Sequence, residues 1–340
     1  MTLIIRIVRT DVEERLVDVA ARIIRKGGVV VFPTETVYGI GADAFNPSAV
    51  RKIFELKGRP PDNPLIVHVA NNEQLVEVTR EIPEIALKLA SKFWPGPLTM
   101  VLPRSERVPD VVTAGLDTVA VRMPSHPIAL SLIKKSGRPV AAPSANLSGR
   151  PSPTLAEHTV DDFYGRVDCI IDGGPTDIGV ESTVIDLTGE IPVLLRPGGL
   201  PLEELEKVVG RVGVHPAVRG GRVDRAKAPG MKYRHYSPRA MMVVVEGRDR
   251  EDKIRELVEK YRRRGLRVGV MASKHYDADE VFLMGESMEE IARNVFKGLR
   301  YLDKRGVDVI IAEGVEERGL GLAVMNRLRK AAGHNVIKGS

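Results

Sequence analysis

The fold is decided by residues 29–39, which read Val29-Val-Val-Phe-Pro-Thr-Glu-Thr-Val-Tyr-Gly39. Its first four residues are all apolar and mostly β-branched, which predicts a short buried strand. The strand runs directly into Pro33, Thr34, Glu35 and Thr36. Hydroxyl groups at the end of a strand can hydrogen-bond a small polar ligand, although a turn whose hydroxyls satisfy one another has the same composition. This strand end is therefore a candidate site, with a plain turn as the alternative.

Helices and strands surround this segment without strict alternation. Apolar residues recur at helical spacing over residues 11–26 and 82–93, and a further helix is predicted from Ser48, as its N-cap, to Lys57. The N-terminal residues read as a strand. Further predicted strands cover residues 65–69, 99–102, 118–122, 140–142, 169–172, 182–186 and 193–196. Residues 1–209 therefore predict an α/β fold whose sheet has mixed direction.

The pattern becomes regular after residue 240. Strands at 241–246, 267–272 and 307–313 alternate with helices at 250–263, 288–304 and near 323–332. Such alternation predicts a small parallel α/β domain over residues 240–340. Between the two domains, residues 210–239 are rich in Gly, Pro and Arg and have no apolar period, so they are predicted to be a linker.

The positive charge of the chain is concentrated in this linker. Of a net +6, residues 1–210 carry 23 Lys and Arg against 27 Asp and Glu, residues 211–240 carry 8 against 1, and residues 241–340 carry 20 against 17. Neither domain is therefore strongly basic. A short basic segment suits either a solvated linker or a cover that closes over an anionic ligand.

Composition excludes several classes of protein. Aromatic residues make up 4% of the chain, too few for a platform that stacks the bases of single-stranded nucleic acid. The one cysteine, Cys169, cannot form an internal disulfide, and no Cys/His cluster has zinc spacing. No apolar run approaches the roughly 20 residues of a membrane span, and the N-terminus lacks the pattern of a signal peptide. We therefore expect a cytoplasmic protein that does not contact membranes.

No phosphate-binding loop or dinucleotide fingerprint is present, so a nucleotide would have to be held in another way. Lys57-Gly-Arg59-Pro, with Asn63 and His68 close behind, suits a phosphate clamp made of a point charge and a bidentate fork. The plainer alternatives are two cations that complement the dipole at the end of a helix, and a histidine that is buried in the core.

Two further segments place polar groups at predicted strand ends. Residues 142–149, Ala-Pro-Ser-Ala-Asn-Leu-Ser-Gly, follow a strand and precede Ser152. Residues 179–186, Gly-Val-Glu-Ser-Thr-Val-Ile-Asp, precede Arg196-Pro-Gly-Gly199. Their serine, asparagine and backbone amide groups can bind a phosphate or a nucleoside. An ordinary polar loop without a ligand has the same composition and is the alternative. No Ser/His/Asp triad or close carboxylate pair is evident, which disfavours a hydrolase.

Taken together, the four segments closely resemble the Sua5/YrdC/YwlC family, the threonylcarbamoyl-AMP synthases. The resemblance spans essentially the whole chain. It rests on Pro-Thr-Glu-Thr-Val-Tyr-Gly at 33–39, Lys-Gly-Arg-Pro at 57–60, Pro-Ser-Ala-Asn at 143–146 and Glu-Ser-Thr at 181–183. Pro-Gly-Met-Lys-Tyr-Arg-His-Tyr-Ser-Pro at 229–238 resembles the linker of the long, two-domain Sua5 form.

The resemblance implies a fold and a reaction. The first domain would be a YrdC-like twisted mixed sheet with a concave cavity, and the second would be Rossmann-like. The reaction would join L-threonine, bicarbonate and ATP into L-threonylcarbamoyladenylate and pyrophosphate, with Mg²⁺ bridging phosphate oxygens rather than held by protein side chains. The product would pass to a separate tRNA threonylcarbamoyl-transferase complex that makes N6-threonylcarbamoyladenosine at position 37 of tRNA.

The resemblance also assigns site residues. Lys57 and Arg59 would be catalytic. L-Threonine would be held by Thr36, His68, Arg122, Ala142 and Ser182, with Arg122 as the partner of its carboxylate. ATP would be held by Lys57, Arg59, Asn63, Thr118, Ser144, Asn146, Ser152, Arg196, Lys232, Arg234, His235 and Tyr236.

The basic linker acquires a role in this interpretation. Folded back over the cavity, it would keep water from a labile carbamate and adenylate and then open to release the product. Trypsin should then cut at Arg234 readily in the free protein and slowly when ATP and threonine are bound.

Two alternatives belong to other classes. One is an RNA-binding protein that reads double-stranded RNA by shape, which the acidic balance of residues 1–210 disfavours although a weak RNA contact is compatible with it. The other is a carbamoyl-adenylating enzyme that uses carbamoyl phosphate, as a related domain of hydrogenase-maturation proteins does. The metal-binding and acylphosphatase segments of those proteins are absent from this sequence.

Overall fold

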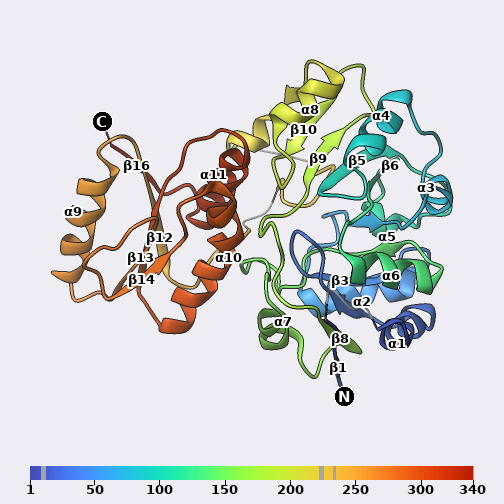
Figure 1. The fold of residues 1–340 in the computed structure, drawn as a ribbon, viewed down its shortest axis with the longest axis horizontal. Coiled ribbons are helices and arrows are strands. Elements are labelled where there is room, and N and C mark those ends of the chain that lie inside the picture. Colours follow the sequence, from blue (N-terminus) through green and yellow to red (C-terminus); the bar gives the residue numbers. More distant parts are fainter. Residues whose placement is uncertain (9–12, 222–225, 233–234, 340) are drawn as a thin grey trace.

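The computed structural model describes residues 1–8, 13–221, 226–232 and 235–339 (Figure 1). Two α/β parts lie side by side, one built from β1 to β11 and the other from β12 to β16. Helices α10 (Met288–Arg305) and α11 (Leu320–Ala331) lie on the side of the second part that faces the first, and α9 (Arg250–Arg262) lies on the far side. The second part therefore turns these two helices toward the first part.

The described strands of the first part form one twisted sheet in the order β1-β8-β2-β3-β7-β4-β6-β5-β9-β10-β11. Their directions are mixed, as predicted: β4 and β6 are parallel, whereas β2 and β3, β3 and β7, and β5 and β6 are antiparallel. The strands are β1 (Leu3–Arg6), β2 (Val30–Phe32), β3 (Gly39–Asp43), β4 (Ile66–His68), β5 (Leu98–Pro103), β6 (Thr118–Arg122), β7 (Val140–Ala141), β8 (Cys169–Asp172), β9 (Thr183–Asp186), β10 (Val193–Arg196) and β11 (Gly213–Val214).

The helices of this part cover the sheet with their apolar faces. Among them, α2 begins earlier than predicted: Asn46, two residues before Ser48, is its N-cap, and Pro47 is its first residue. It ends at Gly58, whose φ of 60° is left-handed. The helices are α1 (Glu14–Arg25), α2 (Pro47–Lys57), α3 (Asn72–Val78), α4 (Glu84–Phe93), α5 (Asp110–Thr113), α6 (Pro127–Ser136), α7 (Ala156–Phe163) and α8 (Leu202–Val209).

Several of these elements give a weak sequence signal. Strand β3 reads Gly-Ile-Gly-Ala-Asp, and glycine weakens a strand by its conformational freedom. Its Gly41 is needed for packing, because an added Cβ would lie 2.6 Å from Val140 Cγ1 and 2.8 Å from Phe32 Cε1. Close approach of neighbouring side chains, which only the tertiary structure reveals, therefore explains why a strand here contains glycine.

The second part is a parallel sheet with helices on both faces, as predicted. Each described strand pair is parallel, in the order β14-β13-β15-β12-β16. Helix α9 packs on one face, and α10 and α11 pack on the other. The strands are β12 (Met241–Glu246), β13 (Val268–Ala272), β14 (Glu280–Leu283), β15 (Val309–Glu313) and β16 (Val336–Lys338). No helix in the described ranges is long and apolar enough to cross a membrane.

The interval predicted as a linker is partly structured. Strand β11 adds to the first sheet beside β10, and a 3₁₀ turn follows at Pro216–Arg219. Ala226, Ala228 and Met231 are buried against residues of β4 and β6 in a shared apolar cluster. The segment thus packs on the first sheet because it supplies apolar side chains at irregular spacing, which no periodicity reveals.

Candidate active site

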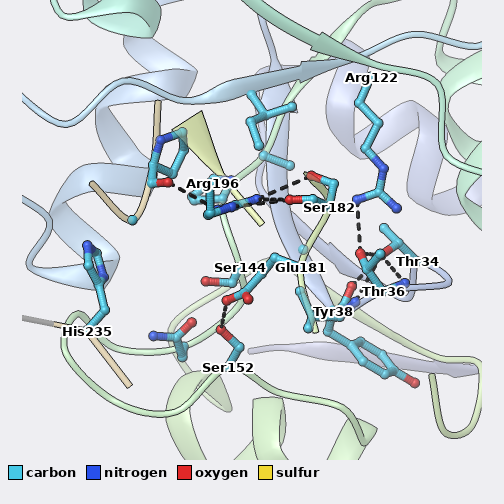
Figure 2. Close-up of a pocket in the computed structure, with 18 of the residues that line it drawn as sticks. Thr34, Thr36, Tyr38, Arg122, Ser144, Ser152, Glu181, Ser182, Arg196 and His235 are labelled. Carbon is cyan, nitrogen blue, oxygen red and sulfur yellow. Dashed lines mark hydrogen bonds between the residues drawn. The ribbon is translucent and has the colours of Figure 1, made fainter. Parts of the chain in front are cut away.

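A pocket lies where the first sheet, the loop after β7 and the residues Pro229, Gly230, His235 and Tyr236 meet (Figure 2). Strand ends supply most of its polar side chains. Its described lining comprises Thr34, Thr36, Val37, Tyr38, Gly39, Arg59, Ile66, His68, Arg122, Ala142, Pro143, Ser144, Asn146, Arg150, Ser152, Glu181, Ser182, Arg196, Pro229, Gly230, His235 and Tyr236. The four segments that the sequence singled out therefore line one pocket.

The first end of the pocket is organised around Arg122, the last residue of β6. Parallel pairing places it beside His68, the last residue of β4, so both side chains leave the sheet at the same edge. The Arg122 Nη1 donates to the Thr36 hydroxyl at 2.9 Å, and its Nη2 lies 2.6 Å from a carboxylate oxygen of Glu35. Residues after β2 and at the end of β6 thus form one cationic, hydroxyl-lined corner.

Burial and charge set the protonation of this corner. Burial alone would raise the pKa of the Glu35 carboxyl, but the adjacent Arg122 holds it below its usual value. Burial and the Arg122 charge lower the pKa of His68 to about 3, so its imidazole is neutral at pH 7. The His68 Nδ1 is buried without a hydrogen-bond partner within the described part of the chain. A neutral imidazole nitrogen is therefore available to a polar ligand.

The opposite wall comes from β9 and β10. The Ser182 hydroxyl lies 2.8 Å from that of Thr99, and Arg196 Nη2 donates to the Ser182 carbonyl at 2.8 Å. Arg196 also reaches the linker, where its Nη1 donates to the Pro229 carbonyl at 3.2 Å. The close approach needs Gly198, because a Cβ there would lie 2.3 Å from the Glu181 carbonyl oxygen.

Glu181 is the one acidic side chain in the described lining. One carboxylate oxygen accepts from the Ser152 hydroxyl at 2.7 Å, and the other accepts from Arg327 Nε at 2.7 Å. Burial opposes ionisation, but Arg327 and then Arg196 lower the pKa of Glu181 to about 2. Glu181 is therefore a carboxylate at every pH at which the protein would be assayed.

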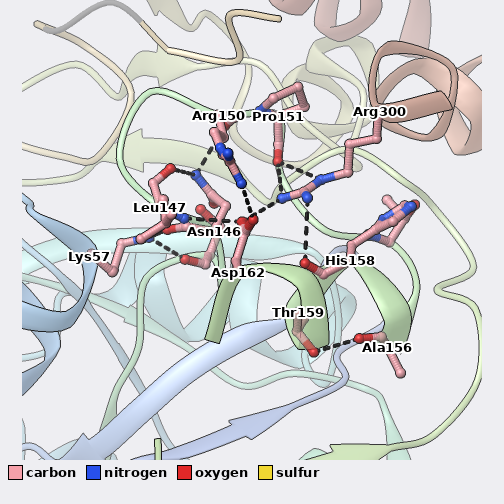
Figure 3. Close-up of polar contacts among 12 residues, drawn as sticks. Lys57, Asn146, Leu147, Arg150, Pro151, Ala156, His158, Thr159, Asp162 and Arg300 are labelled. Carbon is pink, nitrogen blue, oxygen red and sulfur yellow. Dashed lines mark hydrogen bonds and ion pairs between the residues drawn. The ribbon is translucent and has the colours of Figure 1, made fainter. Parts of the chain in front are cut away.

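The shape of the loop after β7 is stabilised by hydrogen bonds from Lys57 of α2 (Figure 3). The Lys57 ammonium donates to the Ser144 carbonyl at 2.5 Å and also to the Asn146 carbonyl. Burial lowers the pKa of Lys57 well below its usual value. On the other side of the loop, Asp162 accepts from the Leu147 amide at 3.2 Å and from Arg150 at 2.7 Å. Lys57 thus shapes the loop and does not line the pocket.

Pro229, Gly230, His235 and Tyr236 border the pocket on its remaining side. Gly230 and Tyr236 both have left-handed backbones, with φ of 86° and 64°. Burial, followed by the charges of Arg59 and Lys330, lowers the pKa of His235 to about 3, which keeps this pocket-lining imidazole neutral. The Tyr236 ring packs 5.1 Å from that of Phe296 on α10. Tyr236 is therefore anchored to the second domain while it faces the pocket of the first.

The pocket brings together most, though not all, of the predicted site residues. All five predicted threonine-binding residues line it, as do seven of those predicted to bind ATP: Arg59, Ser144, Asn146, Ser152, Arg196, His235 and Tyr236. Lys57, Asn63, Thr118 and Lys232 lie outside the described lining, and Arg234 lies outside the described residues.

The positions of the residues outside the lining have simple causes. Thr118 begins β6, two strand repeats before Arg122 and on the same face of the sheet. The Asn63 carbonyl accepts from Arg59 Nε at 3.1 Å, and Lys232 pairs with Asp62 at 2.9 Å. The segment 226–231 packs on the intervening part of this face.

Sequence reasoning missed Arg150 and gave Glu181 no role. Arg150 is one residue beyond the motif that carries the loop, and its only signal was charge. Glu181 stood inside the Glu-Ser-Thr motif, but its partner Arg327 is 146 residues away in the other domain. No group of three or more His, Cys, Asp or Glu side chains in the described ranges is placed to hold a metal ion.

Comparison with known proteins identifies both parts of the chain. The Sua5_yciO_yrdC family model, described as "Telomere recombination", matches residues 22–198. The model of the threonylcarbamoyl-AMP synthase C-terminal domain matches residues 200–333. A threonylcarbamoyl-AMP synthase of Pyrococcus abyssi is 65% identical over 99% of this chain and 100% of its own. One of Bacillus subtilis is 50% identical over 94% of this chain and 93% of its own.

The structural comparison agrees with the sequence comparison. The crystal structure of P. abyssi Sua5 complexed with L-threonine superimposes with a TM-score of 0.98, at 64% identity over 100% of both chains. Both domains therefore have the Sua5 architecture, including the mixed sheet and the parallel α/β domain predicted for them. This chain belongs to the two-domain Sua5 family of threonylcarbamoyl-AMP synthases.

Proposed function

We propose that this protein makes L-threonylcarbamoyladenylate and pyrophosphate from L-threonine, bicarbonate and ATP. The observation that carries the proposal is one pocket with two differently built ends. Arg122, Thr36 and neutral His68 form an end suited to an amino acid, and Arg59 and Arg196 flank an end suited to a polyphosphate. The L-threonine complex of the P. abyssi relative supports the same substrate here.

The amino-acid end would bind threonine through its charged and polar groups. Arg122 already contacts Glu35 and Thr36, so its remaining N–H groups would receive the substrate carboxylate. The unpartnered Nδ1 of His68 and the Ser182 hydroxyl would receive the amine or the hydroxyl of the substrate. Ala142 would close this end with a small apolar surface.

The nucleotide end would bind ATP by backbone and side-chain groups of the loop after β7. Asn146 donates its amide N–H groups to the Leu147 and Arg150 carbonyls, and its buried Oδ1 has no partner within the described ranges. This acceptor suits a hydroxyl or amino group of the nucleoside. Ser144 and Ser152 would add hydroxyl contacts, and Arg59 and Arg196 would neutralise phosphate charge.

Mg²⁺ would enter on the ATP phosphates as part of the substrate. The only carboxylate in the described lining, Glu181, is already bound to Arg327 and Ser152. Phosphate oxygens and water are the ligands that Mg²⁺ commonly keeps in nucleotide sites.

The reaction needs positioning more than covalent help from the protein. The threonine amine and bicarbonate would form an N-carboxy derivative and water. A carbamate oxygen would then attack the α-phosphorus while the bond to the β-phosphate oxygen breaks and pyrophosphate leaves. Arg196 and Arg59 would stabilise the charge that develops on the phosphate oxygens. Pro229, Gly230, His235 and Tyr236, which line the pocket, would exclude water from the carbamate and the adenylate.

Not all predicted residues would touch substrate directly. Lys57 would act by holding the Ser144 and Asn146 carbonyls and thus the shape of the nucleotide loop. Thr118 lies on the face of β6 that segment 226–231 covers, so its contact with ATP would require that segment to move. The adenylate would be the substrate of a separate tRNA-modifying transferase.

The deciding experiment is pyrophosphate release by the full chain with ATP, Mg²⁺ and bicarbonate. Release that requires L-threonine, and is much weaker with L-serine or with no amino acid, is expected. Omission of bicarbonate should abolish it. Absence of release under all conditions, together with salt-sensitive binding of double-stranded RNA, would overturn the proposal in favour of an RNA-binding protein.

A further inference from the structure

Arg327 of α11 is a fully buried arginine at the boundary between the domains. Its Nε donates to Glu181 at 2.7 Å, and its Nη1 donates to the Oδ1 of the neighbouring Asn326 at 2.9 Å. Its guanidinium carbon lies 5.4 Å from the centre of the Tyr236 ring. One side chain of the second domain therefore contacts both the acid and the tyrosine that line the pocket of the first.

Arg327 is itself held in place. The Asn326 amide donates to the Val218 carbonyl of the first domain at 2.9 Å, so the backbone that carries Arg327 is fixed against the turn at 216–219. One helical turn later, the Lys330 ammonium donates to the Gly230 carbonyl in the segment that covers the pocket. Three neighbouring residues of α11 thus reach three different segments of the first domain and linker.

Stability alone gives little reason for such a pair. Removing two charges from water is expensive, and replacing a buried ion pair by apolar residues is often neutral or stabilising. The carboxylate of Glu181, however, has a second partner inside the pocket, the Ser152 hydroxyl at 2.7 Å. A carboxylate can only accept in this bond, so the hydroxyl proton must point to Glu181 and its oxygen lone pairs are left for a donor in the pocket.

We propose that Arg327 is a positioning residue of the nucleotide site: by donating to the Glu181 carboxylate it orients the Ser152 hydroxyl, and by stacking on Tyr236 it holds that ring at the pocket. The inference rests on the proposed function and assigns a part in it to the second domain. The site is complete only when α11 is docked. Arg327 acts through Glu181 and Tyr236 and touches no reacting atom.

Helix α11 offers a matched control. Arg329 pairs with Glu246 at 2.8 Å and with Glu317 at 2.6 Å, both inside the second domain. Arg329→Met removes the same charge from the same helix, at a distance from the pocket. Any loss that it shares with Arg327→Met is therefore due to the helix and not to the site.

The test compares Arg327→Met, Glu181→Gln, the double variant and Arg329→Met as full-length proteins. ATP affinity is measured by calorimetry, and KM for ATP and kcat by pyrophosphate release. We expect Arg327→Met to weaken ATP binding by about tenfold or more, the size of one charge-assisted hydrogen bond. The double variant, which leaves no lone buried charge, should bind ATP as Glu181→Gln does, because the arginine acts through the acid.

A pH profile separates positioning from a merely structural role. Arg327 and Arg196 are cations beside Glu181, and neutral His235 and Tyr236 also face it. Lys330 faces Glu181 as well, and burial lowers its pKa to about 7, so it gains positive charge as pH falls through this value. Without Arg327, burial should raise the pKa of Glu181, so ATP affinity should fall as pH is lowered from 7.5 to 5.5. This decline of ATP affinity at acid pH, the acid limb of the profile, should be absent from the wild type and from the double variant.

Two results would overturn the inference. One is unchanged ATP affinity in Arg327→Met; the other is a loss that is additive with Glu181→Gln and has no acid limb. Failure of the proposed function is distinguishable, because the wild type would then release no pyrophosphate with threonine. The calorimetric comparison of ATP affinities would still decide the role of Arg327.

Discussion

In the proposed function Arg122 would bind a substrate carboxylate while it stays paired with Glu35, which makes the geometry of its guanidinium important. Arg122→Lys keeps one positive charge beside Glu35 but loses the planar fork. We expect KM for L-threonine to rise by about 10- to 100-fold, the equivalent of one or two charge-assisted bonds, with KM for ATP little changed. Steady-state pyrophosphate release at varied threonine and at varied ATP checks this split.

Glu35→Gln is the companion variant, because it leaves Arg122 in place and removes only its buried partner. It should alter KM for threonine far less than Arg122→Lys does. Equal rises in both KM values for Arg122→Lys would contradict the assignment of Arg122 to the amino-acid end.

Three histidines whose pKa values are strongly lowered predict how stability depends on pH. Burial lowers the pKa of His68, His158 and His235 to about 3 from an ordinary 6.5. Between these values the unfolded chain binds more protons than the folded one, so stability must fall as pH decreases from 6.5 toward 3. Thermal unfolding from pH 7.5 to 4.5 should show this decline.

His158 tests the assignment, since it lies outside the pocket and its Nδ1 accepts from the Thr154 amide at 3.2 Å. His158→Gln should flatten the decline of melting temperature with pH, because one fewer proton is taken up on unfolding. An unchanged slope would mean that His158 titrates normally in the folded protein.

Among single elements, the loop after β7 depends on one buried ammonium. Lys57→Met removes the donor to the Ser144 and Asn146 carbonyls and leaves both without that partner. We expect a rise in KM for ATP of about tenfold or more and a destabilisation of about 1–3 kcal/mol, the cost of unsatisfied buried acceptors. KM for threonine should change little, because the proposed threonine-binding residues come from other strand ends.

A suitable control for Lys57→Met is Lys52→Met on the same helix. The Lys52 ammonium donates to the Gly27 carbonyl at 2.8 Å, remote from the nucleotide loop. Its variant should lose stability without the rise in KM for ATP. If both variants raised KM equally, the effect would belong to helix α2 rather than to the loop.

The rate at which trypsin cuts the linker beside the pocket should depend on bound substrates. Lys227 pairs with Asp186, and Lys232 pairs with Asp62, so both tryptic sites are partly exposed but tethered. We expect ATP with L-threonine to slow tryptic cuts within residues 226–239, because the bound ligands would add contacts to the residues that border the pocket. Mass spectrometry of the fragments over time measures the rate of each cut. Cutting after Arg248, on an exposed turn of the second domain, should not change. Equal rates with and without ligands would contradict a gating role.

At the scale of the whole molecule, Gly179 shows how closely the domains are docked. Its φ is 84°, and a Cβ built there would lie 2.3 Å from the Cα atom of Arg293 on α10. Gly179→Ala must therefore push α10 away from the loop that leads to Glu181 and Ser182. We expect the variant to lose most pyrophosphate release and to show faster hydrogen exchange along the domain boundary.

Gly137→Ala is the matched control, because Gly137 also has a positive φ, of 63°, but has open space around its Cβ position. It should lose about 1 kcal/mol of stability from backbone strain alone and keep its activity. Similar losses of activity in both variants would mean that strain, not docking of the domains, explains the effect at Gly179.

Much of this protein could be predicted from its sequence by local physical rules. Val30 to Phe32 form a strand because β-branched residues suit a buried pleat. The regular alternation after residue 240 forms a parallel α/β domain because each strand and helix buries an apolar face. The polar strand ends and their family resemblance also predicted a single cavity that Thr36, Arg122, Ser182 and Arg196 line together. These features depend on neighbours in the chain or on motifs that can be read directly.

Other features were decided only by the tertiary structure. Lys57 shapes the loop after β7 instead of lining the pocket. Its ammonium donates to the Ser144 and Asn146 carbonyls, which are nearly ninety residues away in the chain. Glu181 is ionised and oriented by Arg327 of another domain, a pairing across 146 residues that has no local signal. Local sequence determines which face an element buries, whereas the partners of a buried charge depend on how distant elements dock, because desolvation and Coulomb energies are set by distance in space.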